Sequence, residues 1–94
     1  MFSEFNYQNG NIEYIDNDFS YLYEDMLQVI YPNNHLLDIG WYGSNNGFFI
    51  YIIKNSDWQN PIAKFIAKTE DELKLLIPQA IERIVFESSI NQTL

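Results

Sequence analysis

The chain has 94 residues, no cysteine and a net charge of −8, from 13 acidic and 5 basic residues. This length predicts a single domain over residues 1–94, and the lack of cysteine excludes disulfides and thiolate metal sites. No apolar run approaches the ~20 residues that span a bilayer, and the N-terminus lacks the basic and apolar regions of a signal peptide, so we expect a soluble cytoplasmic protein that does not bind membranes.

The charge is distributed unevenly along the chain. Residues 1–53 hold seven acidic residues and no Lys or Arg, whereas residues 54–94 hold six acidic and five basic residues. An acidic field repels nucleic acid and attracts basic partners, although solubility alone would also explain it. Basic patches that would indicate nucleic-acid binding are absent.

The first half of the chain predicts one short strand and one helix. After an N-terminal arm at residues 1–10, residues 11–15 can form a strand with Ile12 and Tyr14 on one side. Asp16 and Asp18 then supply helix N-cap chemistry for a helix that runs to about Ile30. Its apolar residues follow the spacing of one helical stripe: Phe19, Leu22, Tyr23, Met26, Leu27 and Ile30.

The middle of the chain predicts a three-stranded antiparallel meander. Its strands are expected at about 36–42, 48–54 and 62–68, because two turn-rich clusters separate three apolar, aromatic and β-branched runs. In the first strand, Leu37, Ile39 and Trp41 alternate with Asp38 and Tyr42, so the two sets lie on opposite faces.

A second helix is expected after the meander. Thr69 and Glu72 have the spacing of a capping box, and an apolar stripe continues to about Phe86. Pro78 lies inside the stripe and predicts one bent helix rather than two. Residues 88–94 are expected to form a frayed tail.

These elements predict an α+β two-layer sandwich of order (β)αβββα. A sheet of three or four antiparallel strands would carry both helices on one face. The other face would stay partly open and would display Asp38, Tyr42 and either Phe49 or Tyr51.

No catalytic, cofactor-binding or metal-binding residue is predicted. His35, the only histidine, precedes a strand and is interpreted as a surface or turn residue. Ser44 and Ser56 are turn formers without a neighbouring base. The pairs Asp16/Asp18 and Glu24/Asp25 lack the glycine and the distal glutamate of a calcium loop.

One string of residues resembles a known group of proteins. Leu37 to Tyr42, then Asn46-Gly47-Phe48, then Asp57-Trp58 with Asn60-Pro61, followed by a Glu- and Leu-rich helix, resemble small immunity proteins of bacterial contact-dependent growth inhibition and related polymorphic toxin systems. The resemblance covers roughly residues 36–86. It implies no catalytic motif, but a protein that binds a cognate toxin C-terminal domain, commonly a nuclease, and blocks its active site or substrate surface.

Charge and resemblance together predict an acidic surface that binds a basic nuclease toxin. An acidic regulatory protein, a nucleic-acid mimic and a carboxylate-dependent hydrolase are the alternatives. Trp58 could cover the sheet edge or anchor the contact, and the toxin's activity and the oligomeric state are left open. The predicted partner-binding residues are Asp16, Asp18, Tyr21, Glu24, Asp25, Asp38, Tyr42 and Trp58.

Overall fold

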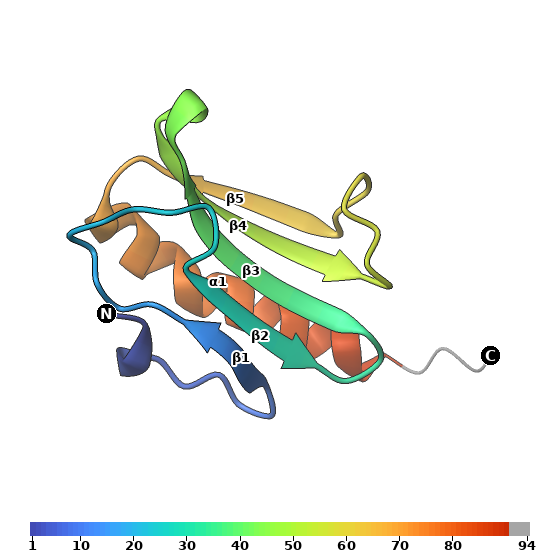
Figure 1. The fold of residues 1–94 in the computed structure, drawn as a ribbon. Helices are drawn as coiled ribbons and strands as arrows, with labels where there is room; N and C mark the ends of the chain where they lie inside the picture. Colours follow the sequence, from blue (N-terminus) through green and yellow to red (C-terminus); the bar gives the residue numbers. More distant parts are fainter. Residues whose placement is uncertain (91–94) are drawn as a thin grey trace.

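The structure is a computed structural model that describes residues 1–90. It contains one antiparallel sheet of five strands, in the order β1-β2-β3-β4-β5, with a single α-helix, α1, against one face (Figure 1). Two short 3-10 helices lie at Phe2–Glu4 and Gly43–Asn45. The strands are β1 (Asn11–Ile15), β2 (Leu27–Tyr31), β3 (His35–Tyr42), β4 (Gly47–Lys54) and β5 (Ala63–Ala67), and α1 spans Glu70–Ser89. Within residues 1–90, no helix has the length and hydropathy of a membrane span.

The predicted order (β)αβββα, with two helices on a sheet of three or four strands, is wrong. The helix expected up to Ile30 does not form: residues 16–26 lack regular structure, and residues 27–31 form β2 between β1 and β3. Leu27, Val29 and Tyr31 are buried while Ile30 is exposed, which is the alternation of a strand.

Local hydrogen bonds explain part of this correction. The side chain of Asp16 accepts a bond from the Asp18 N–H at 3.0 Å, and that of Asp18 accepts one from the Ser20 N–H at 2.9 Å. These are two successive turns in which an Asp side chain bonds the backbone two residues ahead. The residues expected to cap a helix therefore use the same chemistry to hold a non-helical segment.

The three meander strands are confirmed almost to the residue, and so is their division into two faces. Side chains on the α1 side form the core together with one stripe of the helix. The sheet contributes Leu27, Val29, Tyr31, Leu37, Ile39, Phe48, Ile50, Ile52 and Ala67, and the helix contributes Leu73, Ile77, Ala80, Ile81 and Ile84. Trp41 packs at the edge of this core, with its ring centroid 4.9 Å from that of Phe48.

Helix α1 begins as predicted, because the Thr69 side chain accepts a bond from the Glu72 N–H at 3.1 Å. The Glu72 carboxylate in turn accepts a bond from the Lys68 N–H at 2.7 Å. The helix passes through Pro78 without a break, so one helix is confirmed, and its bend stays a prediction. It continues to Ser89, which includes the start of the expected tail; residues 91–94 lie outside the described part of the chain.

The N-terminal segment and β1 hold a second difference from expectation. Phe2 is fully buried, and Tyr7 donates a hydrogen bond from its hydroxyl to the Phe2 carbonyl, so residues 1–10 pack on the domain. An irregularity in β1 pairs Ile12 with Val29 and Tyr14 with Gln28. Those partners belong to opposite faces, so Ile12 and Tyr14 do not share a side as predicted.

Gly40 allows the chain to bulge over the sheet just before β2. The Met26 N–H donates to the Ile39 carbonyl, and the Trp41 N–H donates to the Tyr23 carbonyl, so the intervening residues bulge out beside Gly40. A Cβ added at Gly40 would lie 1.6 Å from the Glu24 carbonyl oxygen. Glycine is therefore needed here for space, since its φ is not positive.

We predict that Gly40→Ala lowers the free energy of unfolding by about 2 kcal/mol, because the Glu24 backbone must move away from the sheet. Gly43→Ala is the matched control: its added Cβ would lie 3.6 Å from the Trp41 side chain, an ordinary contact. Urea denaturation of both variants checks this. Equal stability of the two variants would contradict the steric role of Gly40.

Candidate functional site

The sheet face opposite α1, here called the open face, is the candidate site. Strand register arranges its side chains in rows that cross neighbouring strands. The central row contains Tyr14, Gln28, Asp38, Tyr51 and Lys64, one residue from each strand. An apolar row of Ile30, Leu36 and Ile53 lies on one side of it. Gly40, Phe49 and Ile66 form the row on the other side.

Asp38 occupies the middle of the central row and is 1% exposed. Its Oδ1 accepts a hydrogen bond from the side-chain amide of Gln28 at 2.9 Å. Its Oδ2 is buried without a hydrogen-bond partner among the described residues. Burial raises the pKa of Asp38 to about 6, the hydrogen bond from Gln28 opposes this shift, and the nearby charge of Asp25 adds to it.

Aromatic rings surround this carboxyl group on the open face. The Tyr42 ring centroid lies 5.2 Å from that of Phe49 and 6.1 Å from that of Tyr51. Trp58, from the loop between β4 and β5, continues the cluster at 6.2 Å from Tyr51 and is 47% exposed. The Lys64 ammonium lies 5.0 Å from the Phe49 ring centroid, within the range of a cation–π contact.

The bulge beside Gly40 brings acidic residues to this cluster. Because the Glu24 backbone lies directly over Gly40, Glu24 and Asp25 follow the border of the open face. The pKa of Tyr42 is raised to about 12, first by burial and then by Asp38, Tyr51, Glu24 and Asp25. Negative charge therefore converges on the hydroxyl of Tyr42.

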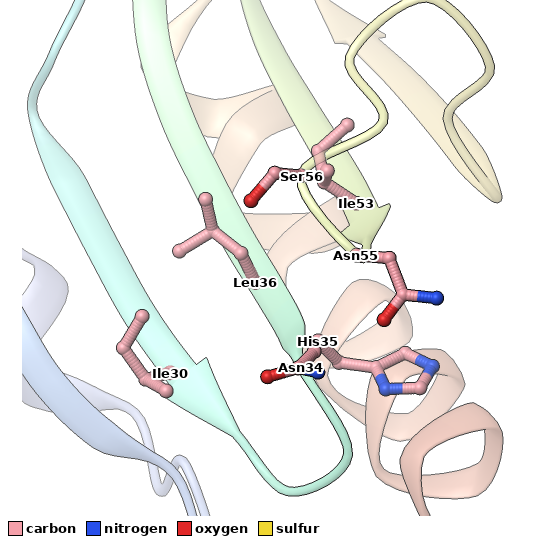
Figure 2. Close-up of a pocket in the computed structure, with 7 residues that line it drawn as sticks. All are labelled: Ile30, Asn34, His35, Leu36, Ile53, Asn55 and Ser56. Atoms are coloured by element: carbon pink, nitrogen blue, oxygen red, sulfur yellow. The ribbon is translucent and has the colours of Figure 1, made fainter.

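The apolar row forms the floor of a shallow pocket of about 420 Å³. Figure 2 shows Ile30, Leu36 and Ile53 on three adjacent strands, with the polar residues Asn34, Asn55 and Ser56 at the end of the sheet. The Asn55 N–H donates to the Asn34 carbonyl at 2.9 Å and closes this end. The pocket extends the open face beyond the aromatic cluster.

The structure divides the predicted partner-binding residues into two groups. Asp38, Tyr42 and Trp58 share the open face, and Glu24 and Asp25 lie at its border.

Asp16 and Asp18 lie beside the N-terminus instead, because Asn17 between them accepts hydrogen bonds from the Met1 amino group and the Phe2 N–H. Tyr21 is 64% exposed, in the loop between β1 and β2.

Sequence reasoning missed Gln28 and Lys64 as members of the site. The sequence predicts Gln28 in a helix, and the cross-strand position of Lys64 follows only from the register of β4 and β5. His35, interpreted as a surface or turn residue, is not at the surface: it is 2% exposed. It does adjoin the β2–β3 turn, and its Nδ1 donates to two carbonyls of that turn. Among residues 1–90, no group of three or more His, Asp or Glu could hold a metal ion.

Comparison of the chain with protein-family models, with curated proteins and with solved structures gives no match.

We predict that Asp38 makes the folded protein less stable as pH rises. The pKa of Asp38 is about 6 in the folded state against an ordinary value of 3.8, so the folded state keeps a proton that the unfolded chain has lost. This contribution is fully present below about pH 4 and is lost through pH 6, a cost of about 3 kcal/mol at neutral pH.

Asp38→Asn should therefore gain about 3 kcal/mol over the wild type between pH 4 and pH 7.5. Chemical denaturation at several pH values measures the difference. Glu82→Gln, which removes an exposed carboxyl group from α1, is the control and should keep a constant difference. A constant difference for Asp38→Asn would show that its carboxyl group is not perturbed.

Proposed function

We propose that this chain is an immunity-type inhibitor that binds a basic toxin domain and neutralises it by covering the surface that binds substrate. In this proposal the protein acts by binding and not by catalysis. The open face is its contact surface, and Glu24 and Asp25 form the acidic border that meets the partner.

The observation that carries the proposal is the composition of the open face. Within residues 1–90 no helix covers it. It carries the ring cluster of Tyr42, Phe49, Tyr51 and Trp58 beside an apolar pocket floor, with Trp58 exposed and Phe49 buried. Tyr and Trp contribute much of the binding energy at protein interfaces. Exposed apolar surface of this kind is typical of an interaction site.

The charge of the chain indicates the kind of partner. Glu24 and Asp25 are exposed, and within the described residues neither forms an ion pair. A basic protein surface would supply the missing positive charge and would speed association at low salt. Nucleases fit this description, because they bind phosphate groups with Lys and Arg. The resemblance to immunity proteins points to the same class of partner.

The first test identifies the gene immediately upstream of this chain's gene, where the proposal expects a toxin, and co-expresses the C-terminal domain that it encodes with this chain. We expect the chain to restore growth and to form a complex whose affinity falls with added salt. Toxicity that persists at full expression of the chain would contradict the proposal. If the chain also inhibited unrelated DNA-binding enzymes, the nucleic-acid mimic would be favoured. If the chain itself showed metal-dependent turnover of a substrate, the hydrolase would be favoured.

We predict that the double variant Glu24→Lys with Asp25→Lys lowers the association rate with the toxin domain about tenfold at low salt, because it reverses the charge of the acidic border. Stopped-flow or surface plasmon resonance measures the rate. The matched control, Glu4→Lys with Glu82→Lys, makes the same change of net charge in a groove on the helix side. Equal rates for the two variants would place the contact elsewhere.

A further inference from the structure

The carboxyl group of Asp38 is buried, but the residues packed around it satisfy only one of its two oxygens. Its Oδ1 accepts a hydrogen bond from Gln28, but Oδ2 has no hydrogen-bond partner within residues 1–90. Only 1% of the surface of Asp38 is exposed to water. Buried carboxylate oxygens are normally paired, because removing them from water without a partner costs free energy. Because Oδ2 lies on the candidate binding face, we infer that its missing hydrogen-bond donor is supplied by the protein that binds there.

The neighbouring rings already accept a positive charge. The ammonium of Lys64 lies 5.0 Å from the Phe49 ring centroid and 6.0 Å from the Tyr51 ring centroid. Tyr51 is the cross-strand neighbour of both Lys64 and Asp38. The chain's own cation thus lies one residue away from the carboxyl group and forms no ion pair with it among the described residues.

We propose that Asp38, together with the rings of Tyr42 and Tyr51, forms a site for one cationic side chain of the partner, an arginine whose guanidinium pairs with Oδ2. This inference rests on the proposed function, because it names the group that the toxin domain inserts into the open face. The site includes neither Asp16 nor Asp18, which the structure places beside the N-terminus.

Access to Oδ2 requires the two tyrosine rings to move, and both are only partly buried. Gly40 lies between Asp38 and Tyr42 on the same face, but the Glu24 backbone covers it, so the side chain of a partner would have to reach Oδ2 past the tyrosine rings. The bond from Gln28 fixes the carboxyl plane, so Oδ2 is held in one orientation. A guanidinium suits this site because it stacks flat on aromatic rings and stays charged at every relevant pH.

The acidic border makes the site selective for a cation. Glu24 and Asp25 add their negative charges to that of Asp38 at the Tyr42 hydroxyl. A phosphate or a carboxylate would be repelled by the same three groups. An arginine at the centre of a contact, surrounded by rings that exclude water, has the position and the chemistry of a dominant interface residue.

The free protein provides a test that does not need the toxin. Isotope-labelled protein is titrated with N-acetyl-arginine methylamide and, separately, with the neutral analogue N-acetyl-citrulline methylamide. We expect the arginine probe to shift the signals of the Asp38 carboxyl, the Gln28 amide and the two tyrosine rings, with an affinity at least about tenfold higher than that of citrulline. Equal shifts with both probes, or no localised shift, would overturn the inference without any variant having to fold.

The variant Asp38→Asn provides a second test, both with the arginine probe and with the toxin domain. It should lose at least about tenfold in affinity for the arginine probe and for the upstream toxin domain, while Glu82→Gln keeps wild-type affinity. Toxin binding that is unchanged by Asp38→Asn would overturn the inference and leave the proposed function standing. Failure of the wild-type chain to bind the toxin domain would reject the proposed function, and the arginine titration would then decide alone whether the site accepts a guanidinium.

Discussion

A single helix packed against a five-stranded sheet is the constraint on which the rest of this structure depends. Helix α1 buries one stripe against the core side of the sheet, and no element of the described residues forms a layer on the opposite side. Each strand therefore points alternate side chains into the core and onto the open face. On the open face the side chains can pack only against one another. Tyr42, Phe49 and Tyr51 do this by ring contacts. Phe49 is buried by them, whereas Tyr42 and Tyr51 stay partly exposed.

The same constraint explains why a carboxyl group can be buried on the open face. The rings and the bulge over Gly40 keep water from Asp38, and Gln28 satisfies only one of its oxygens. Burial in this environment is the main cause of its raised pKa. Burying the ionised carboxyl group lowers the stability of the folded state, and the unfolded chain has no such penalty. A cation that paired with Asp38 would offset this penalty. In the proposed site, stability and partner binding would therefore be linked at Asp38.

Part of the candidate site could be predicted from alternation along a strand. The pattern of Leu37, Ile39 and Trp41 against Asp38 and Tyr42 separated the two faces, and the structure agrees. The pattern could not place side chains across strands, because register is a property of the pairing. Gln28 and Lys64 therefore joined the site only in three dimensions. The sequence alone predicts that the acidic residues share one surface, whereas the bonds of Asn17 hold Asp16 and Asp18 beside the N-terminus.

The sequence by itself determined the meander from β3 to β5 and the start of α1, because turn residues, strict alternation and a capping box are local signals. Only the tertiary structure decided the state of residues 16–31. Their apolar residues fit a helical stripe, but Leu27, Val29 and Tyr31 also fit a strand, and pairing with both β1 and β3 satisfies the backbone on two sides. With that strand in place, one helix was left to cover a five-stranded sheet, and the open face followed.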